Sequence, residues 1–259
     1  MRGFAGHHWG WGRLLVLGAM AVAVLARSGA AASPGATANT RLATALPAGT
    51  TAQVKPPSAA GGAASARPSV APSVLRLGSH GAPVRALQRD LARLTYLPAS
   101  GVDGAFGMRT WHAVVAFQGW SGLIRDGLVG PKTRAALSHA SRPAPWSTAT
   151  GFEVHIGQQV LLIVAGGRVQ RAIHVSTGRP GWPTPRGHYT IQWRSVMSWS
   201  VPFRVWMPLA QYFDDGYAMH EFSDVPTYPA SHGCIRVPSE EAQTVWQFGR
   251  VGMRLWTSP

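Results

Sequence analysis

The sequence contains very little cysteine: Cys234 is the only one among 259 residues. A single thiol excludes an internal disulfide, and it excludes the paired-cysteine motifs of structural zinc sites. The signature that papain-like proteases carry around their cysteine is also absent. Three interpretations of Cys234 remain. It is a small buried side chain, a ligand in a mixed zinc site with His220 and His232, or a reactive thiol.

Long apolar runs are also scarce, and after residue 32 none could cross a membrane. The run Leu14–Ala26 follows a basic leader, precedes small residues and is shorter than the roughly 20 residues that span a bilayer. We therefore predict that residues 1–32 are a secretory signal peptide, or a membrane anchor if they stay uncleaved. Residues 33–72 consist mainly of Ala, Gly, Ser, Thr and Pro, which predicts a disordered linker.

Acidic residues are few: 10, against 24 lysines and arginines, for a formal net charge of +14. The basic residues are scattered, without the dense runs typical of nucleic-acid binding, and export separates the chain from nucleic acid, so no such partner is expected. A basic exported chain suits anionic wall polymers or lipid head groups. A genome-wide preference for arginine would give the same balance.

Residues 73–140 have the pattern of a small all-α domain. Val84, Leu87, Leu91 and Leu94 recur with helical spacing after Pro83. Further helices are expected to begin near residues 108 and 131, each after one copy of an internal repeat. The two copies, Asp103–Thr110 and Asp126–Thr133, are Asp-Gly turns without the pattern of a phosphate or calcium loop. This part of the chain therefore predicts a three-helix bundle.

After a proline-bearing joint at 141–150, residues 151–259 have the pattern of a mainly β domain. Alternation at 152–156 and β-rich runs at 159–164 and 169–176, separated by two glycines, predict a strand and a hairpin. A further strand is expected at 189–193, and the one clear helical pattern spans 239–248. The order of strands with few helices predicts a β-sandwich.

The segment Ser231–Arg236 places the thiol among groups that could activate it. In extended backbone, His232, Cys234 and Arg236 point the same way, and imidazole and guanidinium groups lower a thiol pKa. Gly233 leaves the backbone uncrowded, so that amides there could bind an oxyanion. With His220 upstream, the chain has a nucleophile, a base, backbone donors and a carboxylate-binding cation.

The run Gly216–His220 followed by Ser231–Arg236 resembles the signature of the L,D-transpeptidase catalytic domain. The resemblance covers about 152–256, and the stretches 175–178 and 184–187 resemble early landmarks of that family. It implies a bacterial enzyme that acts on peptidoglycan, with Cys234 as nucleophile and His220 as proton donor and acceptor. Oxyanion and substrate binding would fall to Ser231, His232, Gly233, Arg236 and Tyr217. Glu221 departs from the glycine that often follows the histidine, which leaves open what orients the His220 ring.

That resemblance implies acyl transfer from a tetrapeptide stem, with release of terminal D-alanine, to an acceptor amine. Water as the acceptor would make the chain an L,D-carboxypeptidase, and an inactive catalytic domain would make it a non-catalytic wall-binding protein. The expected partners are peptidoglycan stem peptides and glycan, and no metal or organic cofactor is implied. Asp214, Asp215 and Glu221 belong to an acidic group near the thiol in sequence, and we expect part of it to receive the amine of a diaminopimelate side chain.

Nearly all of the segment 75–138 resembles the helical peptidoglycan-binding domain of many wall enzymes, mainly at positions that describe a core: Leu77-Gly78-Ser79, Gly81, Val84, Leu87-Gln88, Leu91, Tyr96-Leu97 and Ala116-Phe117-Gln118, with the two Asp-Gly turns. The resemblance implies the fold and glycan binding, with a structural appendage as the alternative. A groove near Asp103, Phe106 and Thr110 is the expected ligand site. Aromatic residues at 193–213 are expected in the core, in one wall of a substrate cleft, or in both.

Overall fold

A computed structural model describes residues 74–258. The predicted leader and linker, 1–32 and 33–72, lie outside the described residues. Within 74–258 no helix has both the length and the apolar character needed to span a bilayer.

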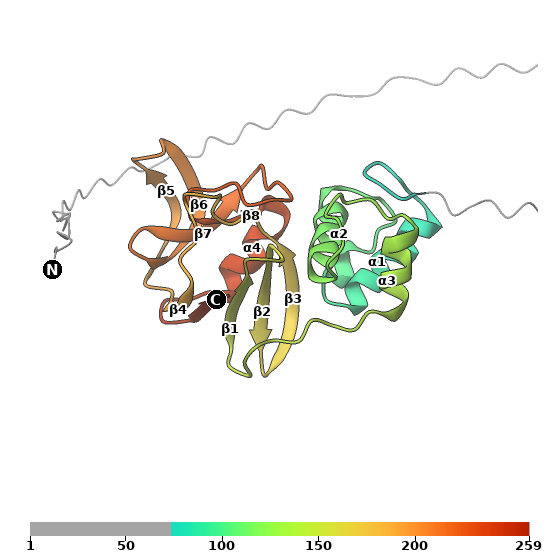
Figure 1. Cartoon of the computed structure of the whole chain (residues 1–259), viewed down its shortest axis with the longest axis horizontal. Coiled ribbons are helices and arrows are strands. Elements are labelled where there is room, and N and C mark those ends of the chain that lie inside the picture. The colour runs from blue at the N-terminus through green and yellow to red at the C-terminus, as the bar shows by residue number, and fades with distance from the viewer. Residues whose placement is uncertain (1–73, 259) are drawn as a thin grey trace, which may run out of the picture. The chain divides into compact units, whose positions relative to one another are not determined.

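The first part of the described chain is a bundle of three helices: α1 (Ala82–Arg93), α2 (Met108–Trp120) and α3 (Pro131–His139), with a short 3₁₀ turn η1 (Ala99–Gly101) between α1 and α2 (Figure 1). A proline lies in the first turn of α1 and of α3, where its missing N–H costs no hydrogen bond. The predicted helix starts near residues 83, 108 and 131 are confirmed.

The two Asp-Gly turns are each fixed by one buried glutamine from the preceding helix. Gln88 donates to Asp103 Oδ1 at 2.8 Å and to Thr110 Oγ1 at 3.0 Å, and its Oε1 accepts the Gly104 N–H. Gln118 makes the same set of bonds in the second copy. Its amide donates to Asp126 Oδ1 and Thr133 Oγ1, and its Oε1 accepts the Gly127 N–H. In each copy of the repeat, the glutamine therefore holds the turn against the preceding helix, and we call this arrangement a glutamine clamp.

The remainder is two sheets and one helix. The five-stranded sheet has the order β3-β2-β1-β9-β4 and contains β1 (Gly151–His155), β2 (Val160–Ala165), β3 (Arg168–His174), β4 (Gly187–Thr190) and β9 (Arg254–Thr257). The four-stranded sheet has the order β5-β6-β7-β8 and contains β5 (Trp193–Ser200), β6 (Val205–Asp214), β7 (Tyr217–Phe222) and β8 (Ile235–Pro238). Helix α4 (Ser239–Phe248) directly follows β8.

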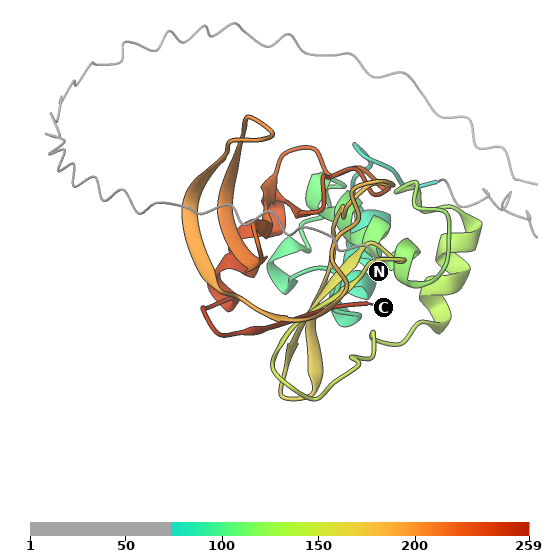
Figure 2. The same ribbon diagram turned by 60° about the vertical axis from the view of Figure 1, so that its left-hand side comes forward.

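Side chains that alternate along the strands fill the space between the sheets. Phe152 and Val154 of β1 enter this core with Phe213, Met219 and Ile235 of the other sheet. Their neighbours in sequence, such as Glu153 and Ala218, are buried on the opposite faces of the two sheets. The predicted sandwich is confirmed, and Figure 2 shows the long β5–β6 hairpin, drawn in orange, curving away from the other strands.

The strand expected at 189–193 is wrong as a single element. Ile191 donates its N–H to Met253 O, beside β9, whereas Gln192 donates to Tyr212 O on β6. The chain therefore passes from one sheet to the other between these residues, and β4 and β5 belong to different sheets.

The helical bundle and the five-stranded sheet share one apolar core. Val160 and Leu162 of β2 and Ala172 of β3 pack in the same cluster as Leu91 and Phe117 of the helices. Polar contacts also cross from the bundle: His112 Nδ1 lies 2.9 Å from His174 Nδ1, and Arg109 Nη2 donates to the Glu240 carbonyl oxygen at 3.3 Å.

Candidate active site

The parallel pairing of β7 with β8 brings the predicted catalytic residues together. His220 lies opposite Arg236, and Met219 lies opposite Ile235. Met219 and Ile235 are buried between the sheets, so by alternation His220 and Arg236 lie on the other face. Cys234, one residue before Ile235, packs against Ala218 on that same face.

A backbone carbonyl orients the His220 ring. Nδ1 lies 2.8 Å from the carbonyl oxygen of Glu221, which can only accept, so Nδ1 carries the hydrogen and Nε2 keeps its lone pair. Burial lowers the pKa of His220 to about 4. The hydrogen bond to Glu221 opposes this shift, and the charge of Arg236 adds to it. At neutral pH the imidazole is therefore an uncharged base. The orienting group left open by the sequence is the main chain at Glu221.

Cys234 is partly buried, among Met207, Ala210, Tyr212 and Ala218. Burial raises the pKa of its thiol, although a backbone hydrogen bond from Ala218 and the charge of Arg236 partly oppose this effect. Arg236 therefore lowers the thiol pKa as expected, but desolvation is the larger effect, so the net shift of the thiol pKa is upward. The resting pair is an uncharged thiol and an uncharged imidazole.

The Ser231 hydroxyl holds the loop that carries the thiol. Its Oγ donates to Cys234 O at 2.5 Å and accepts the Gly233 N–H at 3.0 Å. The Gly233 amide is thus occupied, which contradicts its expected role as a free oxyanion donor. Gly233 has φ +110°, and a Cβ there would lie 2.3 Å from the Tyr217 ring, so only glycine fits. Tyr217 packs against this glycine.

The loop before β4 supports the thiol loop, and it was only partly visible in the sequence. Thr184 Oγ1 donates to Gly233 O at 2.8 Å, and Thr177 O accepts the N–H of Ser231. Gln159 in turn bonds Thr177, through Thr177 N at 2.8 Å and Thr177 Oγ1 at 2.7 Å. Thr177 and Thr184 lie in the stretches that resemble family landmarks. No local signal marks the role of Gln159, because its partner is 18 residues away.

His232 does not continue the strand, because β8 begins only at Ile235 and the intervening Gly233 has a positive φ. Its ring stacks on Phe203 at 4.3 Å and lies edge-on to Trp182 at 5.2 Å. Arg179 Nη2 donates to its Nε2 at 2.8 Å. His232 therefore builds an aromatic wall beside Cys234, and the expected side-by-side arrangement of 232, 234 and 236 holds only for the last two.

Arg236 keeps a guanidinium that a substrate could use. The group lies 4.1 Å above the Phe222 ring, and within residues 74–258 no carboxylate lies within 4.0 Å of it. Desolvation lowers its pKa while the charge of Asp224 opposes that shift. A half-buried guanidinium of this kind suits a substrate carboxylate.

The structure contradicts the ligand groove expected in the helical domain. Phe106 is buried in the core, and Thr110 is buried and bonded to Gln88. Asp103 accepts the N–H of Ala105 and the Gln88 amide, and these bonds lower the pKa of its carboxyl group. Phe106 and Thr110 are therefore not free to contact a polymer, whereas Asp103 is exposed and its role in binding stays a prediction.

The aromatic segment 193–213 is divided between the core and the surface, and its role in a substrate cleft stays a prediction. Phe213 is in the core between the sheets, whereas Phe203 forms part of the wall beside His232. Asp214 has a raised pKa, from burial first and from the charge of Asp215 second. The role of these carboxylates with a substrate amine stays a prediction.

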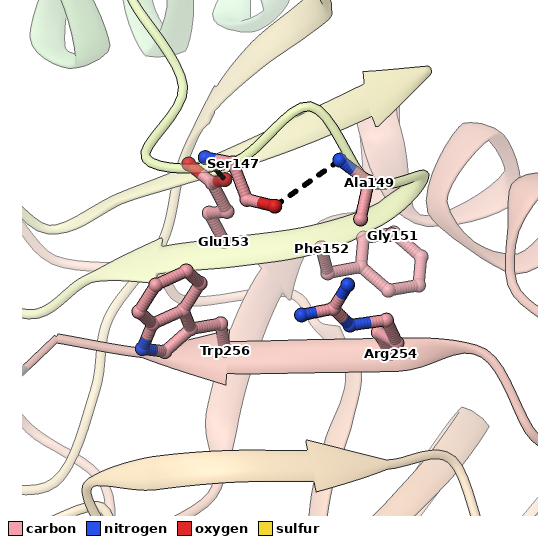
Figure 3. A pocket seen from close by; sticks show the side chains of 7 residues that line it. All are labelled: Ser147, Ala149, Gly151, Phe152, Glu153, Arg254 and Trp256. Carbon is pink, nitrogen blue, oxygen red and sulfur yellow. Dashed lines mark hydrogen bonds between the residues drawn. The ribbon is translucent and has the colours of Figure 1, made fainter. Parts of the chain in front are cut away.

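A surface hollow elsewhere contains neither the thiol nor the imidazole. It lies between the joint and β9 and is lined by Ser147, Ala149, Gly151, Phe152, Glu153, Arg254 and Trp256 (Figure 3). Across residues 74–258, no three His, Cys, Asp or Glu side chains are grouped as a metal site would require.

A thiol and an oriented imidazole on neighbouring strands are the pair required by cysteine acyltransferases. The profile of the L,D-transpeptidase catalytic domain matches residues 150–256, and that of a peptidoglycan binding domain matches residues 80–137. The solved L,D-transpeptidase (residues 123–326) from Xylanimonas cellulosilytica is 38% identical, with a TM-score of 0.68 over 72% of this chain and 98% of that one. The chain belongs to the L,D-transpeptidase family.

Two curated relatives match part of the chain. A probable N-acetylmuramoyl-L-alanine amidase of Bacillus licheniformis is 40% identical over 78 residues, which are 30% of this chain and 22% of the relative. The amidase CwlL of the same organism is 39% identical over 67 residues, which are 26% and 19% of the two chains. This chain therefore spans about a fifth of the length of these relatives.

Proposed function

We propose that this chain is a peptidoglycan L,D-transpeptidase in which Cys234 is the nucleophile and His220 is the general acid and base. One observation carries the proposal. The Glu221 carbonyl holds the His220 ring so that Nε2 is a free base, on the strand next to the thiol and on the same face of the sheet. Catalysis takes place outside the cytoplasm, with export or anchoring through residues 1–32.

In the first half-reaction, His220 Nε2 takes the Cys234 proton as the sulfur bonds to the carbonyl carbon of the third residue of a donor stem. The tetrahedral intermediate collapses, its C–N bond breaks, and the imidazolium returns the proton to the leaving D-alanine nitrogen. A thioester on Cys234 is the product. Because the Gly233 amide is bonded to Ser231, we assign the oxyanion to the Cys234 backbone N–H, a contact worth about 3–4 kcal/mol elsewhere.

In the second half-reaction, His220 removes a proton from an acceptor amine, which attacks the thioester carbonyl. The C–S bond breaks and the thiol regains its proton, so the enzyme is restored and a new amide is formed. Water in place of the amine would give L,D-carboxypeptidase activity. The aromatic wall of Phe203, Trp182 and His232 and the guanidinium of Arg236 are the groups we assign to stem-peptide binding.

The test is covalent labelling followed by turnover. We expect incubation with a carbapenem to add its mass to the protein at Cys234, and Cys234→Ala to abolish the adduct. His220→Gln should slow adduct formation by about 10²- to 10⁴-fold. His80→Gln, an exposed histidine in the helical domain, is the matched control and should label at the normal rate.

With a tetrapeptide donor and an amine acceptor, cross-linked dimer indicates transpeptidation, and free D-alanine alone indicates carboxypeptidation. Labelling that persists in Cys234→Ala would refute the assignment of the nucleophile. Single neutralisation of Asp214, Asp215 or Glu221 should raise KM for the donor if these carboxylates receive its amine, and three unchanged values would exclude that role.

A further inference from the structure

The outer face of the five-stranded sheet is covered over β2, β3 and β1 but not over β9 and β4. The helical bundle packs on Val160, Leu162 and Ala172 of β2 and β3. The joint covers β1: the Trp146 ring lies 3.8 Å from the buried His155 ring. No such covering lies over β9 and β4 among residues 74–258.

The uncovered strands carry large aromatic and cationic side chains. Register places Glu153, Trp256 and His188 side by side on β1, β9 and β4. The Trp256 ring lies 4.0 Å from His188 and 5.3 Å from Trp146, which is 39% exposed. Trp146, Trp256 and His188 thus form a continuous row, which we call the aromatic strip. Exposed apolar rows of this kind mark binding surfaces more often than chance.

A hollow lies beside the aromatic strip, between Trp256 and Arg254 of β9 and the joint residues Ser147 and Ala149 (Figure 3). Gly151 lies opposite Arg254 and lines the same hollow. A Cβ at Gly151 would lie 2.6 Å from the Arg254 carbonyl oxygen, so a side chain there is excluded. Strands β1 and β9 thus pack closely at this point, and the shallow hollow above them is framed by an aromatic ring, a guanidinium and a hydroxyl-bearing loop.

The hollow is lined by one guanidinium and one carboxylate, so its net charge is zero, and the guanidinium is the charged group that a ligand can reach. Glu153 is its one carboxylate, and both oxygens are used: Oε2 accepts the Trp146 N–H at 2.9 Å and Oε1 the Ser147 N–H at 3.1 Å. Arg254 is exposed, and within the described residues no carboxylate lies within 4.0 Å of it. A guanidinium in this position can bind a carboxylate from a ligand.

We propose that the aromatic strip and Arg254 bind the glycan strand of peptidoglycan, separately from the thiol site and from the helical domain. The apolar faces of the sugar rings pack on Trp256 and Trp146, and a carboxylate borne by the strand pairs with Arg254. An open, shallow surface suits a polymer that continues on both sides, whereas small ligands are usually enclosed. The combination of rings and a free cation matches a glycan strand whose lactyl carboxylates are free because its stem peptides have been removed.

The test measures binding of the full chain to two soluble probes. One is peptidoglycan glycan strands stripped of stem peptides by an amidase, so that their lactyl groups carry free carboxylates. The other is N-acetylglucosamine oligomers, which have the sugar faces but no carboxylate. We expect Trp256→Ala and His188→Ala to weaken binding to both probes by about 5- to 10-fold, and Arg254→Gln to weaken only the carboxylated one.

Arg250→Gln removes another exposed arginine and is the control for charge. Melting curves identify variants that have lost the fold; His188 and Arg254 are exposed, so their variants remain informative if Trp256→Ala unfolds. Unchanged affinities in His188→Ala and Arg254→Gln would overturn the proposal. Carbapenem labelling of Cys234 should be normal in every strip variant, so failure of this proposal is distinguishable from failure of the proposed function.

Discussion

At the scale of single residues, the site depends on desolvation more than on its charges. The thiol pKa is raised and the His220 pKa is lowered, both chiefly by burial, although Arg236 is near each. A buried, uncharged pair avoids the cost of holding two ions out of water. The proton then moves only when a substrate carbonyl is present, which protects the thiol from adventitious reaction.

This resting state predicts an unusual pH dependence of labelling. His220 with a pKa of about 4 is already a free base at pH 5, so the rate of carbapenem acylation should change little between about pH 5 and 7. Below pH 5 the rate should fall as the ring is protonated. Stopped-flow or mass-spectrometric rates across pH 3.5–8 would check this, and a fall centred near the ordinary histidine pKa of about 6.5 would contradict it.

Gly233 is the position least tolerant of change in the thiol loop. Gly233→Ala would place a Cβ against the Tyr217 ring in a backbone conformation that L residues avoid. We expect a loss of about 2–4 kcal/mol of unfolding free energy and at least about 10²-fold in acylation rate. Gly107→Ala, at ordinary φ with open space around its Cβ, is the matched control. Equal acylation rates in the two variants would show that the loop is adaptable.

The sequence predicted which residues would lie together at the candidate site but not what supports them. Cys234, His220 and Arg236 could be singled out because the pattern of residue types is local and specific, and their catalytic roles stay a prediction. The occupied Gly233 amide, and the burial of Phe106 and Thr110, were missed because they depend on where a hydroxyl or a glutamine amide from another segment lies. The raised thiol pKa was missed because alternation does not reveal desolvation.

At the scale of elements, the helical bundle is held by its two glutamine clamps. Gln88 and Gln118 are almost wholly buried and each satisfies an aspartate, a threonine hydroxyl and a backbone N–H of one turn. Each glutamine therefore joins a helix to the start of the next one. The helix starts were predictable because proline and the Asp-Gly turns mark them. The passage of the chain between the sheets at Ile191 was not predictable, because a change of strand partner leaves the pattern of residue types unchanged.

Replacing either glutamine with leucine should destabilise the fold strongly. The variant leaves the buried N–H of the turn glycine without an acceptor and removes the amide donor shared by the aspartate and the threonine hydroxyl, at a cost of about 2–4 kcal/mol for each clamp. Chemical denaturation of Gln88→Leu and Gln118→Leu would measure it, with the exposed Gln243→Leu as control. A loss of less than about 0.5 kcal/mol in both clamps would mean that water replaces the amide.

At the scale of the whole molecule, the bundle and the catalytic domain are joined by a core rather than by a flexible joint alone. The shared apolar cluster includes Leu91 and Leu162, and the His112–His174 pair and the bond from Arg109 to the Glu240 carbonyl oxygen cross the same boundary. The two domains should therefore unfold together.

The histidine pair makes this boundary sensitive to acid. Burial, as the largest cause, lowers the pKa of His112 to about 4 and that of His174 to about 3, while Glu240 opposes the shift of His112. Unfolded histidine has a pKa of about 6.5, so the unfolded chain binds protons between about pH 6.5 and 4 that the folded chain does not. Stability should be complete above pH 6.5 and fall as the pH falls toward 4.

Differential scanning calorimetry from pH 7 to 4.5 should show Tm falling by at least about 5 °C as a single transition. The change of Tm with pH should be smaller in His112→Gln than in the wild-type chain. It should be unchanged in His139→Gln, because His139 is an exposed histidine on α3. Identical slopes in the two variants would show that the pair does not govern this loss.

The carbonyl that aligns His220 belongs to the peptide unit itself, so no point substitution can delete it. The side chain at position 221 is therefore not needed to orient the imidazole, and the glutamate can be replaced while the His220 ring keeps its hydrogen bond. A library randomised at this codon should yield many active clones that differ in substrate preference. Directed evolution of new acyl donors has a natural first target there.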